Sequence, residues 1–177
     1  TSHNVAVGYE ALGSNTADYN TAVGREALAL SSTGTRLVAV GNRALYTNST
    51  GSYLTAIGDH ALNANTTASN NTAVGYYALV NNTTGTKNTA VGSNAADAIT
   101  TGNFNVALGS DSLTANTTGN SNTALGVEAL KANTTASNNV AIGKDAMIAN
   151  TTGAQNTAIG ANALDASTTA NDNCAVG

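Results

Sequence analysis

"NTAVGYYALVNNTTGTK", residues 71–87, is followed at once by a second "NTAVG" that begins at Asn88. The closing glycine of this phrase recurs along the whole chain of 177 residues, at Gly8, Gly24, Gly41, Gly58, Gly75, Gly92, Gly109, Gly126, Gly143, Gly160 and Gly177. The first interval is 16 residues and each of the next nine is 17. A fixed period that fills a chain predicts one stack of similar structural units. Residues 1–177 are therefore expected to form a single repeat array.

Numbered from its first asparagine, one unit reads N1-T2-A3-V4-G5-x6-x7-A8-L9-x10-x11-N12-T13-T14-G15-x16-x17. Position 3 is Ala in all eleven copies, and position 4 is always Val, Ile or Leu. All sixteen charged residues stand at positions 6, 7, 10, 16 or 17. Those positions are expected to face water, and the remaining positions to be buried or stacked.

The residue types of the repeat predict an all-β fold. A helix is opposed by the many Asn, Thr and Gly residues, whereas "TAVG" followed by turn residues is typical of a short strand. One coil per repeat gives a parallel β-solenoid, or β-roll, of about ten 17-residue coils and roughly 48 Å in length. Asn at positions 1 and 12 is expected to form amide ladders, and Gly at positions 5 and 15 to supply positive φ at the corners.

The core of such a coil looks thin, because only positions 4 and 9 carry large apolar side chains. Within the strand, Thr and Val share one face and the constant Ala occupies the other. Charge never appears at position 3 in eleven copies. We therefore expect both faces of the strand to be covered, one by the coil interior and the other by a neighbouring chain.

The phrases "NTAVG", "NTAIG" and "NVAIG" resemble the core pentapeptide of YadA-like head repeats in trimeric autotransporter adhesins. The fuller phrase "NTAVGYYALVNNTTG" is similar to repeats of bacterial surface fibres and phage tail fibres. This resemblance covers the whole chain, although YadA-like units are nearer fourteen residues. It implies a homotrimer of left-handed parallel β-rolls with the small-residue strand at the three-fold axis. The position-3 alanines, among them Ala73, Ala90, Ala107 and Ala124, are then expected to pack along that axis.

The sequence contains no motif for catalysis or for cofactor binding, so we expect no enzyme, no cofactor and no metal site. A formal charge of −4 excludes the basic surface that nucleic acid requires. The strongest candidate for a metal site is the column Asp111, Glu128 and Asp145 at position 7, which resembles a set of Ca²⁺ ligands. Lys144 adjoins it, and a solvated acidic stripe explains it better. No run is apolar enough to insert in a membrane.

Exposed aromatic residues are the candidate contacts for an external ligand, because a ring offers both an apolar face and, in Tyr, a polar group. Tyr53 and Phe104 occupy position 17, while Tyr76 and Tyr77 occupy positions 6 and 7. The candidate partners are a host-surface glycan or protein, besides further copies of the chain. The single cysteine, Cys174, stands at position 2 and is expected to be a small buried apolar residue.

Two functions compete on these observations. The leading hypothesis is a segment of a longer extracellular trimeric fibre, either a bacterial surface adhesin or a phage tail fibre, that acts as shaft or as head. The alternative is a monomeric ice-binding β-solenoid that uses the stacked Asn and Thr of positions 12 to 14. Adjacent Thr residues on a strand point to opposite faces, so only one outward rank of hydroxyls is expected there.

Overall fold

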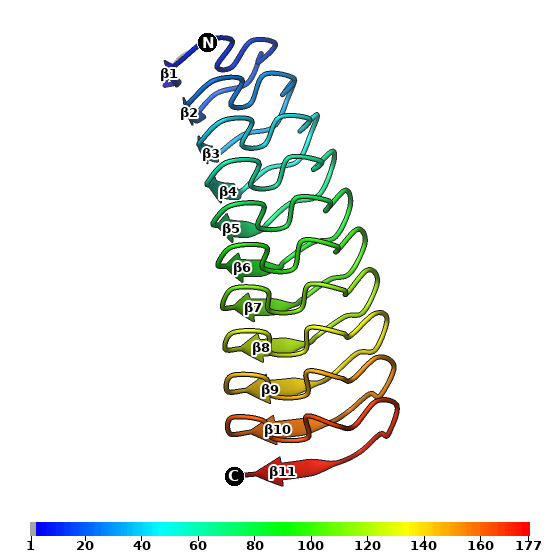
Figure 1. The fold of residues 1–177 in the computed structure, drawn as a ribbon. Helices are drawn as coiled ribbons and strands as arrows, with labels where there is room; N and C mark the ends of the chain where they lie inside the picture. The colour runs from blue at the N-terminus through cyan, green and yellow to red at the C-terminus, as the bar shows by residue number, and fades with distance from the viewer. Residues whose placement is uncertain (1–2) are drawn as a thin grey trace.

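The computed structural model describes residues 3–177 as a stack of coils, each one repeat long (Figure 1). Every coil contributes one short strand to a single parallel sheet whose strands follow the order of the chain. The strands are β1 Val5–Val7, β2 Thr21–Val23, β3 Leu37–Val40, β4 Leu54–Ile57, β5 Thr72–Val74, β6 Thr89–Val91, β7 Val106–Leu108, β8 Thr123–Leu125, β9 Val140–Ile142, β10 Thr157–Ile159 and β11 Cys174–Val176. The predicted parallel β-solenoid of about ten 17-residue turns is confirmed.

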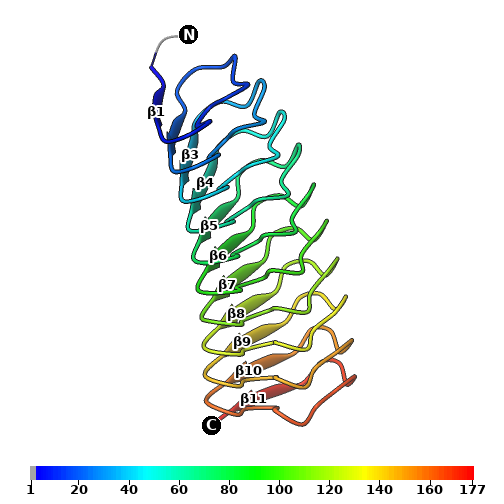
Figure 2. The same ribbon diagram turned by 45° about the horizontal axis from the view of Figure 1, so that its top comes forward.

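Equivalent repeat positions lie directly above one another. Ala73 of β5 is paired with Ala90 of β6, and Ala90 with Ala107 of β7. Figure 2 shows the strands forming one side of the stack, with the rest of each coil closing the other sides. No helix among residues 3–177 has the length and apolar character that crossing a membrane would need.

The alternation of side chains along each strand places position 3 inside the coil. Ala73, Ala90, Ala107 and Ala124 are each 0% exposed in the single chain. They pack with the position-8 and position-9 side chains of the same coils in one continuous core. The prediction that these alanines contact a neighbouring chain at a trimer axis is therefore wrong, because their own coil already covers them. The space between two runs of one narrow coil explains why position 3 never exceeds Ala.

The single chain also exposes less surface than its thin core led us to expect. Its accessible surface is 7047 Å², whereas a typical monomer of 17.4 kDa exposes about 7,900 Å². Small side chains and close-packed coils make the core narrow but well filled. The core by itself therefore does not require a partner chain.

The run from position 5 to position 12 lies opposite the sheet and is built from consecutive turns. In this run the amide of Leu28 donates to the carbonyl of Ala44 in the next coil, while that of Ser31 donates to Leu28 within its own coil. The alternation requires a left-handed backbone at non-glycine residues, such as Arg43 at φ 54° and Leu45 at φ 52°. A non-glycine residue in this region costs about 1–2 kcal/mol, which the completed ladder between coils must offset.

The predicted asparagine ladders are present on the inside of the coil. At position 1, the Oδ1 of Asn71 accepts the backbone amide of Asn88 at 2.8 Å, and the Nδ2 of Asn71 donates to the carbonyl of Gly85. At position 12, the Nδ2 of Asn65 donates to the Oδ1 of Asn48 at 2.8 Å. These buried amides satisfy one another and the corners of the chain, which is the condition for burying polar groups.

The two glycine corners of the repeat use glycine for different reasons. Gly75, at position 5, has φ 139°, as predicted. Gly51, at position 15, is not among the positive-φ glycines, so the prediction for that corner is wrong. A Cβ on Gly51 would instead lie 2.2 Å from the carbonyl oxygen of Ala68 in the next coil. Close approach of two coils, and not backbone conformation, favours glycine there.

Candidate functional site

The outward face of the sheet is a continuous surface of one chemical character. It is formed by positions 2 and 4 of eleven strands, which carry only aliphatic residues, Thr and the terminal Cys174. Within the sheet, Val91, Leu125 and Ile159 remain 38–39% exposed. No charged residue interrupts this face over a length of roughly 48 Å. A long uncharged aliphatic strip of this kind is typical of an interaction surface.

Polar groups on this face are left available. The hydroxyls of Thr72, Thr89 and Thr123 make no hydrogen bond to the described chain, in contrast to Thr66, whose hydroxyl donates to the carbonyl of Thr83. Cys174 lies on the same face at the last strand and is exposed. The prediction that Cys174 is buried is wrong, because position 2 points outward.

The four candidate ligand-contact aromatics lie at opposite ends of the strands and do not form one surface. Tyr53 and Phe104 precede their strands and lie three coils apart, while Tyr76 and Tyr77 follow the glycine corner at the other end. Tyr76 and Tyr77 have ring centroids 4.3 Å apart, and the ring of Tyr77 stacks on that of His60. This end of the strands therefore holds a local aromatic cluster of its own.

The position-17 column holds two groups in which rings contact cations of neighbouring coils. The Arg36 guanidinium lies 5.8 Å from the ring centroid of Tyr19 and 5.3 Å from that of Tyr53, and it donates to the Tyr53 hydroxyl. The Lys87 ammonium lies 4.9 Å from the ring of Phe104. Because these contacts occupy ring faces along the stack, the column stabilises the order of the coils more readily than it offers a platform for a ligand.

The acidic column Asp111, Glu128 and Asp145 is largely paired. The Lys131 ammonium lies 3.0 Å from a Glu128 oxygen, and Lys144 forms an ion pair with Asp145. Hydrogen bonding to these carboxylates raises the pKa of both lysines. Within residues 3–177 no three His, Cys, Asp or Glu residues come together as metal ligands. Weak or absent Ca²⁺ binding stays a prediction, and the two ammonium groups support it.

The three side chains at positions 12 to 14 point in different directions, into the coil, along the stack and towards solvent. Asn65 and Asn116, each the first residue of an Asn-Thr-Thr sequence, are 0% exposed and serve as turn residues. The hydroxyl of Thr117 donates to the carbonyl of Thr134, while Thr118 is exposed. The chain thus presents one outward rank of hydroxyls here, as the alternation predicted, and this geometry does not favour the ice-binding alternative.

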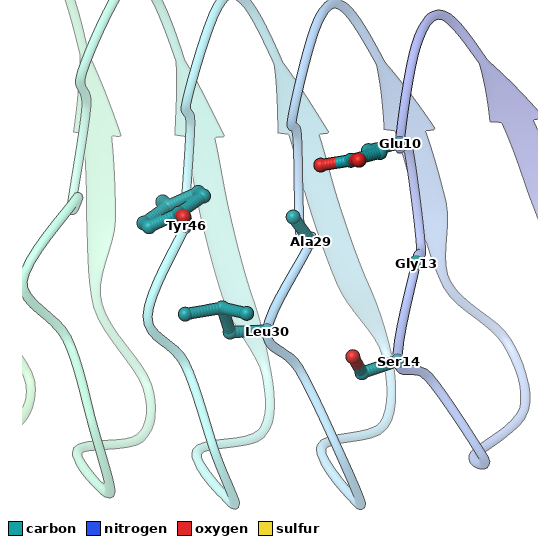
Figure 3. A pocket seen from close by; sticks show the side chains of 6 residues that line it. All are labelled: Glu10, Gly13, Ser14, Ala29, Leu30 and Tyr46. Atoms are coloured by element: carbon teal, nitrogen blue, oxygen red, sulfur yellow. The ribbon is translucent and has the colours of Figure 1, made fainter.

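One hollow lies on the run opposite the sheet, in the first three coils, and has a volume of about 320 Å³ (Figure 3). Its lining is formed by Glu10, Gly13, Ser14, Ala29, Leu30 and Tyr46. The sequence reasoning missed it. The available signal was the pair of small residues, Gly13 and Ala29, at position 10, where later coils carry Asn63, Val80 or Asp97.

No protein-family model, curated protein or solved structure matches the chain. The likeness to YadA-like repeats therefore rests on the repeated phrases alone, and the arguments on function rest on the geometry described above.

Proposed function

We propose that the chain is a structural and adhesive segment of an extracellular homotrimeric fibre, of the kind found in bacterial surface adhesins and phage tail fibres. The observation that carries this proposal is the outward face of the sheet. Eleven strands in register present aliphatic side chains and free Thr hydroxyls with no charge among them. Three left-handed solenoids packed through this face around a common axis would cover it along its whole length.

Several properties of the face favour further copies of the same chain as its occupant. The aliphatic rows repeat at the coil spacing of about 4.8 Å, and an identical parallel solenoid repeats with the same period. The face is long and only about 10 Å wide at three residues per strand, so no single globular partner would fill it. At about 48 Å by 10 Å the strip covers about 480 Å², so residues that flank it must also take part if each partner is to bury the roughly 800 Å² of a stable interface.

Chemistry performed by the chain is not supported by its geometry. Ion pairs at positions 6, 7 and 10 hold several carboxylates against cations, as Arg25 and Arg43 hold Glu26. The proposed function therefore assigns the chain no catalytic step and no cofactor. Its work is to span a distance outside the cell or virion and to present its lateral surfaces.

Light scattering after size exclusion tests the assembly directly. We expect a mass three times 17.4 kDa for the chain. The double variant Val91→Lys with Leu125→Lys places ammonium groups on the outward face, where three copies would bring them together, and should give a folded monomer. The matched control Thr84→Lys with Thr118→Lys carries the same charges at position 14 and should remain trimeric. A monomeric, well-folded parent chain would overturn the proposal.

A further inference from the structure

The hollow of the first three coils is a consequence of which side chains stand at position 10. Successive coils lie about 4.8 Å apart, so the backbones at Gly13 and Tyr46 are about 10 Å apart. Between them only the methyl group of Ala29 projects from this position. Figure 3 shows Ala29 as the floor, with Tyr46 on one side and Glu10 and Ser14 on the other.

The two ends of the hollow differ in chemistry. At one end, the Tyr46 ring and the Leu30 side chain, which is 49% exposed, form an apolar wall. At the other end, the Glu10 carboxylate extends over the hollow and the Ser14 hydroxyl lies at its rim (Figure 3). The hollow thus combines an aromatic surface with hydrogen-bonding oxygens at a separation that leaves room for one small ring.

The charge of Glu10 is available to a ligand. Glu10 forms no ion pair among residues 3–177, and its hydrogen bond with the Tyr9 side chain, which raises the pKa of Tyr9, leaves its charge uncompensated. Glu26, the equivalent residue of the next coil, is instead held by Arg25 at 2.6 Å and by Arg43 at 2.5 Å. The hydrogen bond from Arg43 also lowers the pKa of Glu26. Two carboxylates at the same repeat position therefore differ in role: one is neutralised within the fold, and the other faces the hollow with acceptor oxygens.

From this arrangement we infer that the hollow binds one neutral pyranose ring of a glycan. This inference rests on the proposed role as an attachment fibre and names its ligand class. The C–H face of a sugar ring packs on an aromatic side chain, while its hydroxyls donate to a carboxylate and to Ser14. A volume of about 320 Å³ is at the small end of ligand sites, which suits a single residue.

The uncompensated charge of Glu10 selects against anionic ligands, because it repels a carboxylated or sulfated sugar. The Arg43 guanidinium lies 5.3 Å from the centroid of the Tyr46 ring, and its charge is balanced by its ion pair with Glu26. The hollow lies on the run opposite the sheet, so packing of copies through the outward face leaves it open (Figure 3).

Saturation-transfer NMR with the methyl glycosides of glucose, galactose and N-acetylglucosamine, each at millimolar concentration, tests the site. We expect transfer to at least one of them and none to N-acetylneuraminic acid. Tyr46→Ala should weaken binding about tenfold, since the aromatic contact is lost. Ala29→Val, which installs the side chain that Val80 carries at this position, should abolish it by filling the hollow. Glu10→Gln should keep weak binding.

The control is Tyr53→Ala, which removes an exposed tyrosine that does not line the hollow and should leave the signal unchanged. Retained binding in Ala29→Val, or transfer to none of the three glycosides, would overturn the inference. Light scattering on the same samples separates the two proposals. A trimer that binds no sugar contradicts the hollow alone, and a monomer that binds one contradicts the assembly alone.

Discussion

The two faces of the sheet are built from alternate residues of the same three-residue strands and obey opposite rules. The inward face is Ala at every level and is fully buried from β2 to β10, as at Ala90 and Ala107. The outward face varies among Thr, Val, Ile, Leu and, at Cys174, Cys, but it never accepts charge, as at Val91 and Leu108. The invariant position 3 therefore lies in the confined interior of one chain. Positions 2 and 4, which vary but remain uncharged, form the surface that we assign to a partner.

The largest effect is expected from enlarging the inward face. Ala90→Leu combined with Ala107→Leu forces two bulky side chains into adjacent closed coils, and overpacking costs about 1–3 kcal/mol at each site. Thermal unfolding followed by circular dichroism should shift strongly downward or show no folded chain at all. Thr118→Leu, on the exposed turn outside the proposed interface, is the control and should change the stability by about 0.5 kcal/mol or less.

A melting curve for the double alanine variant that overlays that of the parent chain would break the comparison. It would mean that the coil can widen, and the invariance of Ala would then need another cause.

A middle-sized effect is expected where the inward side chains have been exchanged. In the coil of residues 88–104, Ala96 stands where Leu is usual and Ile99 where Asn is usual, and both are buried. Ala96→Leu alone should overpack the coil by about 1–3 kcal/mol, whereas Ala96→Leu with Ile99→Asn restores the common pair and should nearly recover the parent stability. Urea unfolding of the parent, the two single variants and the double variant gives the coupling energy between the two sites. Strictly additive changes in the free energy of unfolding would contradict the idea that Ala96 and Ile99 compensate for each other.

The same coil supplies a second reason why adding Ile99→Asn should restore stability to Ala96→Leu. The Ile99 side chain has no amide to donate, and the buried Oδ1 of Asn82 in the preceding coil is left without a partner. An asparagine at this site would extend the ladder that Asn65 and Asn82 already form at 3.3 Å.

The smallest effect is expected from Asp97, outside the core but partly buried. Burial raises the pKa of this carboxyl, and its Oδ1 has no partner. A raised folded pKa means that the folded chain holds its proton more tightly, so the parent loses stability as the pH rises through that pKa. Asp97→Asn should therefore unfold at a slightly higher temperature at pH 7, and the difference should vanish below about pH 4. A difference that stays constant with pH would contradict this assignment.

Much of the fold could be predicted because every coil repeats the same local chemistry. The strands, the register and both asparagine ladders follow from the spacing of "NTAVG" and of the asparagine at position 12. The direction of the strand's two faces did not follow, because alternation says that Ala opposes Thr and Val but not which side is inside. The left-handed backbone at Leu45 left no trace in its residue type. The hollow at Ala29 forms because two neighbouring coils carry small residues at position 10, and a single repeat does not reveal such a combination.

The most direct test is whether the outward face is covered. In a Cys174→Ser background, a cysteine is placed either at Thr123 on the outward face or at Thr118 on the exposed turn, and the rate of maleimide labelling is measured. Position 2 already carries a cysteine in the natural chain, so the substitution suits the site. We predict fast labelling of Thr118→Cys and much slower labelling of Thr123→Cys, with the slow rate becoming fast when Val91→Lys and Leu125→Lys are added. Equally fast labelling at both sites in the parent assembly would show an open sheet face and would contradict the account.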